Sequence, residues 1–309
     1  MMRGRTIFAV LIALAVVATA CGGAGSGTSG GTARPDVTVG STNFYEQLTL
    51  GELYAQILEA NGYKVTRKFN LGNREIVQPA LESGQIDVDA EYLATLLAFV
   101  DKDGKIAKPT TDPKETQAGL QKALDAKNLT VLDPAAATDQ NGFVVTKATA
   151  DSKSLKKLSD LAPVAKDMIL GGPPECPQRP FCALGLKNTY GLTFKDFKPL
   201  DAGGPLTVAA LDGKQIDVGL LFTSDPSIVA KNFVLLDDDK HLQLADNIAP
   251  VVRNAVLQKD DGTLKRLLNS ISAKLSQSEL NDMNKQVAVD KKDSKDVAAA
   301  WLKKQGLIK

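Results

Sequence analysis

A nine-residue pattern occurs twice in this chain, as ALESGQIDV at residues 80–88 and as ALDGKQIDV at residues 210–218. Each copy has the features of a helix end, a glycine-containing turn and a short strand whose Ile and Val enter a core. Tyr92 and Phe222 follow the two strands, at the carboxyl ends where open α/β sheets bind ligands. The repeat therefore predicts two lobes that each present such an edge. The alternative is a common helix-to-strand junction that carries no such meaning.

The size and charge of the chain narrow the possible functions. Its 309 residues are enough for two domains of ordinary size, each with its own core. With 43% apolar and 24% charged residues, the chain has the balance of a soluble globular protein. The formal charge of +1 gives no electrostatic reason to bind nucleic acid, so we expect no such partner.

The amino terminus has the pattern of an export signal. Residues 1–20 carry Arg3 and Arg5, then an apolar run, then small residues before Cys21. This predicts a signal peptide, and its end resembles the lipobox of bacterial lipoproteins, in which the cysteine is lipid-modified. A plain secreted protein is the alternative. Residues 21–35 then form a Gly-rich, flexible tether, so we expect anchorage at the extracytoplasmic face of the bacterial cell membrane.

Strand and helix patterns alternate in the first part of the folded region. Apolar residues indicate strands at residues 37–41, 63–69 and 85–90, with a helix in each interval. This order is the βαβ alternation of a parallel sheet. The sequence therefore predicts an α/β fold.

Later segments predict that the chain leaves the first lobe and returns to it. A fresh strand begins near residue 143, whereas the strand at residues 249–253 and the helical pattern of residues 263–307 fit the first lobe. That lobe is then discontinuous in sequence. The predicted division is lobe 1 at residues 36–138 plus 245–309 and lobe 2 at residues 139–244.

Few residues point to catalysis or to metal binding. Cys176 and Cys182 lie among prolines without a nearby histidine, so behind a signal peptide we expect a disulfide that closes a small loop. His241 is the only histidine, and no phosphate loop, zinc spacing or nucleophile elbow is present. The sequence thus predicts no enzyme, metal or cofactor. Three carboxyl residues are candidates for the wall of a polar cleft: Asp89, Glu91 and Asp139.

Six segments, taken in order, resemble the substrate-binding lipoproteins of osmoprotectant ABC transporters, the OpuAC/ProX-like family that binds glycine betaine, choline or carnitine. They are GSTNFYEQ (40–47), FNLG (69–72), ALESGQIDVDAEYLAT (80–95), YGLTF (190–194), ALDGKQIDVGLLFTSD (210–225) and LLDDDKHLQLADNIAPVVR (235–253). The resemblance implies a type II periplasmic-binding-protein fold, with two lobes hinged to close on a ligand. It also implies a monomer that binds a small solute between the lobes and delivers it to an ABC permease.

The same resemblance implies a cage of aromatic rings around a trimethylammonium group. Such a group has no hydrogen to donate, and each π-face attracts it by about 0.5–2 kcal/mol. The positions that match the ligand-binding segments of the family are Asn43, Phe44, Tyr92, Thr95, Asn141, Phe143, Phe222 and Thr223.

Three departures from the family pattern leave the solute open. Thr42 stands where members often have Lys or Arg, Leu93 and Ala94 replace a Thr-Gly pair, and Phe143 lacks a tyrosine hydroxyl. These changes favour a ligand without a carboxylate, or a different small polar or aromatic molecule for which the protein is carrier or sensor. An extracytoplasmic enzyme on the same two lobes is a third reading, and it would need a metal or a poised base in the cleft.

Overall fold

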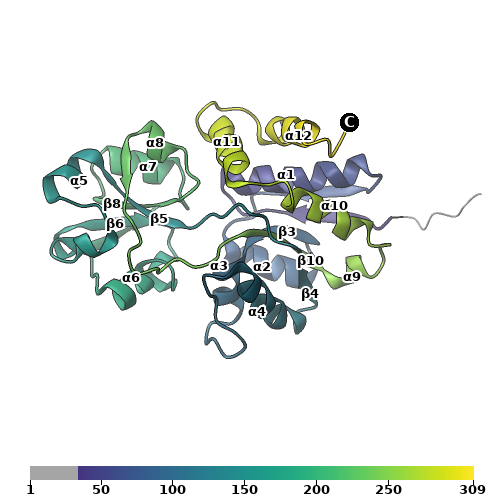
Figure 1. Cartoon of the computed structure of the whole chain (residues 1–309), viewed down its shortest axis with the longest axis horizontal. Coiled ribbons are helices and arrows are strands. Elements are labelled where there is room, and N and C mark those ends of the chain that lie inside the picture. The colour runs from purple at the N-terminus through teal and green to yellow at the C-terminus, as the bar shows by residue number, and fades with distance from the viewer. Residues whose placement is uncertain (1–33) are drawn as a thin grey trace, which may run out of the picture. The chain divides into compact units, whose positions relative to one another are not determined.

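The computed structural model describes residues 34–309 (Figure 1). The predicted signal peptide, Cys21 and nearly all of the predicted tether lie outside the described residues. Within residues 34–309, no helix combines the length and the apolar character that crossing a membrane requires.

The first sheet has the strand order β2-β1-β3-β10-β4. β1 runs parallel to β2 and β3, whereas β10 is antiparallel to both of its neighbours. The central strand β3 is buried along its whole length. The strands are β1 (Val37–Gly40), β2 (Val65–Lys68), β3 (Val88–Tyr92), β4 (Leu129–Val131) and β10 (Ile248–Arg253).

The second sheet repeats this arrangement in the order β7-β6-β8-β5-β9. β6 is parallel to β7 and β8, and β5 is antiparallel to β8 and β9. β5 and β10 occupy equivalent places, each reached by a crossing from the other sheet (Figure 1). The strands are β5 (Asn141–Thr146), β6 (Ile169–Gly172), β7 (Asp196–Pro199), β8 (Val218–Phe222) and β9 (Phe233–Leu235).

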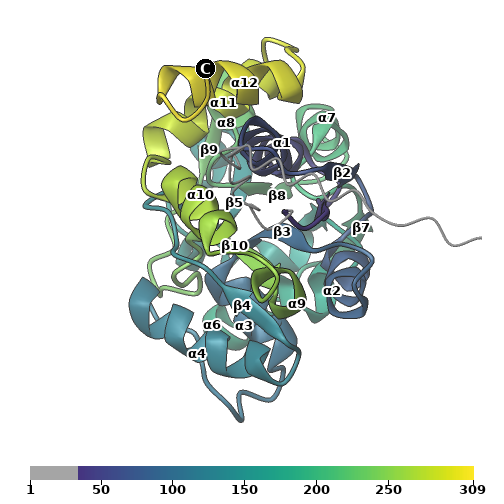
Figure 2. The ribbon, with the colours of Figure 1, turned by 90° about the vertical axis from the view of Figure 1, so that its right-hand side faces the viewer.

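Helices cover both sheets. The carboxyl-terminal helices α10 to α12 lie beside α1, where their apolar faces share one core with β1 and β3 (Figure 2). Around the first sheet are α1 (Tyr45–Ala60), α2 (Arg74–Ser83), α3 (Leu93–Val100), α4 (Pro113–Asp125), α9 (Asn254–Leu257), α10 (Thr263–Ser272), α11 (Gln277–Ala288) and α12 (Ser294–Lys304). Around the second are α5 (Lys147–Lys153), η1 (Leu158–Leu161), η2 (Ala165–Asp167), η3 (Cys176–Gln178), α6 (Ala183–Tyr190), α7 (Pro205–Asp212) and α8 (Ser227–Ala230).

The sequence repeat forms the same junction in both lobes, α2 to β3 and α7 to β8. The isoleucine of each copy packs on a glycine of the neighbouring strand. A Cβ atom added to Gly40 would lie 2.4 Å from Ile86, and one added to Gly171 would lie 2.6 Å from Ile216. Only a residue without a side chain allows so close an approach. The isoleucine of each copy therefore needs a glycine on the neighbouring strand of its own sheet.

The aspartate of the repeat also has one role in both copies. The Asp87 Oδ2 atom accepts a hydrogen bond from the Thr38 backbone N–H at 2.9 Å. In the second lobe, Asp217 Oδ2 accepts from the Ile169 N–H at 2.8 Å. Each carboxylate thus ties the start of its strand to the adjacent parallel strand. This shared chemistry explains why an acidic residue precedes the strand in both copies.

Helix α3 was not predicted, because it follows β3 without an intervening turn. Its first three N–H groups, at residues 93–95, donate to acceptors at residues 245–247 over 2.8–3.2 Å. A helix start normally needs such partners close in sequence. Here the second crossing supplies them from about 150 residues away, and local sequence does not show this contact.

Candidate functional site

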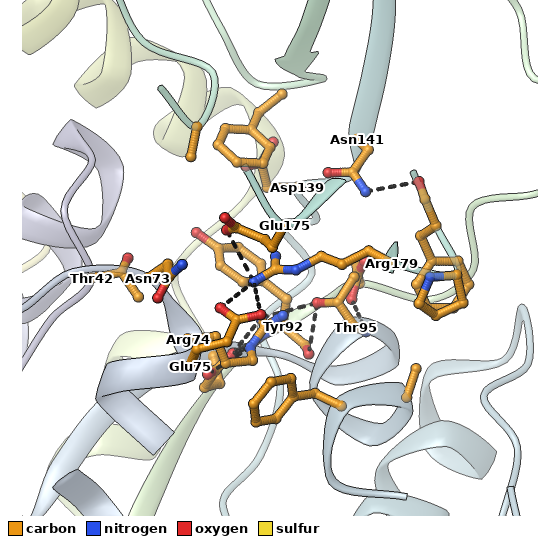
Figure 3. Close-up of a pocket in the computed structure, with 18 of the residues that line it drawn as sticks. Thr42, Asn73, Arg74, Glu75, Tyr92, Thr95, Asp139, Asn141, Glu175 and Arg179 are labelled. Atoms are coloured by element: carbon orange, nitrogen blue, oxygen red, sulfur yellow. Dashed lines mark hydrogen bonds and ion pairs between the residues drawn. The ribbon is translucent and has the colours of Figure 1, made fainter. Parts of the chain in front are cut away.

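A pocket of about 440 Å³ opens where the carboxyl ends of β3 and β8 meet (Figure 3). This volume is within the range of about 300–1,000 Å³ that is typical of small-molecule sites. Both lobes line it, through the β1–α1 turn, the starts of α2 and α3, the first crossing and the loop before α6. The pocket therefore lies at the strand edges that the repeat predicted.

Three rings form one side of this pocket, and we call them the aromatic wall: Phe44, Tyr92 and Phe222. The ring centroids of Phe44 and Tyr92 are 6.4 Å apart, and those of Phe44 and Phe222 are 4.9 Å apart. Phe44 and Tyr92 belong to the first lobe, whereas Phe222 ends β8 of the second. The wall is thus assembled from both lobes.

A buried ion pair forms part of the pocket floor. The Arg74 guanidinium donates to both carboxylate oxygens of Glu91 over 2.6–3.1 Å, and also to Thr95 Oγ1 at 3.0 Å. Burial opposes the charged form of Arg74, but Glu91 outweighs burial and raises the pKa of the arginine. The Nε and Nη2 atoms of Arg74 are thus engaged within the protein, and Glu91 supplies the counter-charge of the guanidinium.

A second arginine spans the pocket. Cys176 and Cys182 are joined by a disulfide with a Cα–Cα distance of 5.2 Å, and Arg179 lies within the loop that it closes. The Arg179 Nη2 atom donates to the carboxylate of Glu75 on α2 at 2.8 and 3.1 Å (Figure 3). It also pairs with Glu175 at 3.2 Å. The Arg179 side chain is nevertheless 29% exposed.

The loop that carries Arg179 is held by its backbone. The Phe181 carbonyl oxygen accepts hydrogen bonds from the side-chain amides of Asn141 and Gln243, each at 3.0 Å. Asn141 begins β5 and lines the pocket. These bonds fix the Cys176–Cys182 loop to the second sheet.

Gln47 on α1 lines the pocket and has a buried side-chain amide without a hydrogen-bond partner in the described chain. It is 1% exposed, and neither its amide nitrogen nor its amide oxygen has a hydrogen-bond partner within residues 34–309. An unpaired buried amide costs free energy, and such groups in native proteins call for an explanation.

Six of the eight predicted ligand-binding residues line the pocket: Asn43, Phe44, Tyr92, Thr95, Asn141 and Phe222. Two of the three candidate carboxyl residues, Glu91 and Asp139, line it as well. Asp89 lies in the core instead, 1% exposed and without a hydrogen-bond partner in the described chain. Burial and then the charge of Glu91 raise its pKa well above the usual range.

Phe143 and Thr223, which were also predicted as ligand contacts, do not line the pocket. Phe143 is 1% exposed and packs in the core of the second lobe, because it lies two residues farther along β5 than Asn141. Thr223 exchanges two hydrogen bonds with Gln140, at 2.9 and 3.0 Å. It holds the first crossing against β8.

Among the pocket residues that the sequence analysis did not single out are Gln47, Arg74 and Arg179. Gln47 lies within a segment that resembles the family, and Arg179 lies inside the cysteine loop, so both had a weak signal. Arg74 had none. Within residues 34–309, no group of three or more His, Cys, Asp or Glu side chains is arranged to hold a metal ion.

Asp246 supports a prediction about pH. This residue is 1% exposed and its Oδ1 accepts from the Thr95 N–H at 2.8 Å, yet burial raises its pKa to about 7. The folded protein thus keeps a proton that the unfolded chain loses near pH 4, so the free energy of unfolding falls as pH rises from about 4 to about 7. Asp246→Asn should raise the free energy of unfolding at pH 8 by about 2–3 kcal/mol and change little at pH 4.

Urea unfolding at both pH values measures this effect. Asp103→Asn, at an exposed carboxylate, is the control and should leave the pH dependence unchanged. If the free energy of unfolding of Asp246→Asn falls between pH 4 and 7 as steeply as that of the original protein, Asp246 does not carry the proton.

Residues 35–304 match the family model for the substrate-binding domain of ABC-type glycine betaine transport systems. The glycine betaine-binding protein YehZ of Escherichia coli is 28% identical over 90% of this chain and 93% of its own length. The ergothioneine transport permease/ergothioneine-binding protein EgtU of Helicobacter pylori is 26% identical over 85% of this chain and 46% of its own length.

A solved structure described as a glycine betaine/carnitine/choline ABC transporter matches with a TM-score of 0.68 and 28% identity, over 88% of this chain and 99% of that one. A lactococcal OpuAC with glycine betaine, 18% identical, matches with a TM-score of 0.62 over 88% and 96% of the two chains. The predicted α/β fold of two-lobe, type II periplasmic binding proteins is therefore confirmed. Because the family model spans most of its length, the chain belongs to the family of substrate-binding domains of ABC-type glycine betaine transport systems.

Proposed function

We propose that this protein is an extracytoplasmic solute-binding protein, without enzymatic activity, that captures a quaternary ammonium solute between its lobes and delivers it to an ABC permease. The observation that carries the proposal is the aromatic wall, in which rings from both lobes meet at the strand edges. Each π-face attracts a quaternary ammonium by about 0.5–2 kcal/mol. Because the rings come from two lobes, all three can attract the same ammonium group only when the lobes are together.

Carboxyl and basic residues both line the pocket. The carboxyl residues are Glu75, Glu91, Asp139, Glu175 and Asp246, and the basic residues are Arg74, Lys102 and Arg179. Burial raises the pKa of both Asp139 and Asp246. Because Arg74 is engaged by Glu91, the partly exposed Arg179 is the better partner for a solute carboxylate. A zwitterionic solute would then place its ammonium at the aromatic wall and its carboxylate toward Arg179 and Gln47.

The family relation and the amino-terminal pattern support a particular location. We expect Cys21 to be acylated after cleavage, so that the tether holds a monomeric folded region at the outer face of the membrane. Intact mass of protein extracted from membranes, together with light scattering, tests both statements. An unacylated, freely secreted protein would contradict the anchor.

Calorimetric titration of the full chain with glycine betaine, choline and carnitine is the direct test. Saturable binding in the micromolar range, about −8 kcal/mol, is expected for at least one of them. Glycine is the matched control, since it keeps the carboxylate of glycine betaine but lacks the three methyl groups. It should give no measurable heat of binding.

Ergothioneine belongs in the same titration, because one relative is named for that betaine. The pocket also offers the three rings of the aromatic wall and the buried unpaired amide of Gln47. Tighter binding of ergothioneine than of the other solutes would identify a ring-bearing quaternary solute as the substrate. If folded, solute-free protein binds none of the four, the proposal is wrong and the fold serves another small molecule.

A further inference from the structure

The carboxylate of Glu46 joins segments that are far apart in the sequence. Glu46 lies in the first turn of α1 and is 1% exposed. Its Oε1 atom accepts from the Tyr92 hydroxyl at 2.6 Å, and its Oε2 atom accepts from the Ser224 hydroxyl at 2.8 Å. The Asn284 side-chain amide of α11 donates to the same Oε2 at 2.5 Å and to Ser224 Oγ at 3.0 Å.

These bonds connect the two lobes. Glu46 and Tyr92 belong to elements of the first sheet, and Asn284 lies on α11, which packs against α1. Ser224 instead follows β8 of the second sheet, and its N–H donates to Asp139 of the first crossing at 3.0 Å. The Ser224–Glu46 bond therefore joins the two lobes directly.

The hydrogen bonds around Glu46 form a network, and one end of it reaches the solute site. The ring of Tyr92 belongs to the aromatic wall, and its hydroxyl bonds to Glu46, which does not line the pocket. Burial raises the pKa of Glu46, and the hydrogen bonds from Tyr92, Asn284 and Ser224 oppose that rise because they stabilise the charged carboxylate. The ring position of Tyr92 and the attachment of Ser224 therefore depend on the same carboxylate.

We propose that Glu46 is a positioning residue that couples the solute-facing ring of Tyr92 to the closed arrangement of the two lobes. The inference rests on the proposed function for its binding consequences, but the link between the lobes is independent of any solute. Contact between a solute and the Tyr92 ring then strengthens closure, and closure in turn fixes the ring.

Two mild substitutions separate the two ends of the network, so that Glu46 itself need not be removed. Ser224→Ala deletes the hydroxyl that binds Glu46 from the second lobe. Tyr92→Phe keeps the ring but deletes the hydroxyl that binds Glu46. Each should speed solute dissociation about tenfold and leave the association rate unchanged. Together they should cost little more than either alone, because each already breaks the connection at Glu46.

Tyr63→Phe is the matched control. The Tyr63 hydroxyl donates to Asp260 at 2.5 Å, so this change also removes a tyrosine–carboxylate bond, but one that lies within the first lobe. It should leave the dissociation rate unchanged. A merely structural role for the Glu46 bonds would lower the stability of all three variants without this kinetic difference.

Small-angle scattering without solute completes the test. Ser224→Ala should enlarge the radius of gyration, and Tyr63→Phe should not. Unchanged scattering of Ser224→Ala, or effects of Ser224→Ala and Tyr92→Phe on dissociation that multiply to about a hundredfold, would overturn the inference. Failure of the unaltered protein to bind solute would contradict only the proposed function, since the scattering comparison still tests the link.

Discussion

Glu91→Gln is expected to lower the free energy of unfolding by about 3–5 kcal/mol, because it leaves the buried Arg74 guanidinium without a counter-charge. The side chains of Arg74 and Glu91 are only 10% and 3% exposed, so water in the pocket replaces little of the lost carboxylate. Glutamine keeps the size of the side chain, and packing therefore changes little. Urea unfolding of the solute-free protein at pH 7 measures the loss.

The exposed pair Lys147–Asp151 is the control for this prediction, since both side chains are more than half exposed. Asp151→Asn should change stability by less than about 0.5 kcal/mol. Replacing both members of the buried pair, with Arg74→Met and Glu91→Leu, should recover much of the loss of the single variant. A single Glu91→Gln variant as stable as the control would mean that Arg74 finds another counter-charge, with Asp246 as the neighbour to examine.

The part of the fold that could be predicted from sequence depends on local patterns. The repeat predicted two equivalent helix–turn–strand junctions. In both sheets, its Asp and Ile contact residues at corresponding positions of the neighbouring strand. The apolar strand at residues 249–253 predicted the return to the first lobe, where β10 pairs with β3 and β4. Such features depend on residues that are adjacent in the chain.

The features that were missed depend on contacts distant in sequence. Helix α3 starts on acceptors from residues 245–247, which no local pattern reveals. Phe143 matched a binding segment of the family, but the depth of its position on β5 places it in the core. Matching a family segment identifies which residues lie along a strand. Only the residues at the end of that strand reach the pocket, and the match does not show where the strand ends.

The same distinction applies to charged residues of the site. Arg74 and Glu91 are 17 positions apart, and Arg179 and Glu75 are 104 apart. Both arginines are paired with carboxylates, and they differ in side-chain exposure, which is 10% for Arg74 and 29% for Arg179. The sequence therefore pointed to the three aromatic residues that line the pocket, but not to the pairing of its charged residues.

Phe44→Ala is expected to weaken binding of the quaternary ammonium solute about 30-fold, or about 2 kcal/mol, because Phe44 is the ring that contacts both other members of the aromatic wall. Phe44→Leu separates the two contributions of the ring. It keeps most of the apolar bulk but removes the π-face, so the loss should remain near tenfold for a cation. Calorimetric titration of both variants with the best solute measures the change.

A neutral ligand and a remote ring provide the controls for the Phe44 variants. The tert-butyl isostere of choline has the shape of the cation without its charge, so Phe44→Leu should affect it far less than choline. Phe197→Ala removes a half-buried ring on β7 that does not line the pocket, and it should leave affinity unchanged. If Phe44→Leu binds the cationic solute as tightly as the original protein, the wall acts through apolar contact alone, and the pocket would suit neutral ligands as well as quaternary amines.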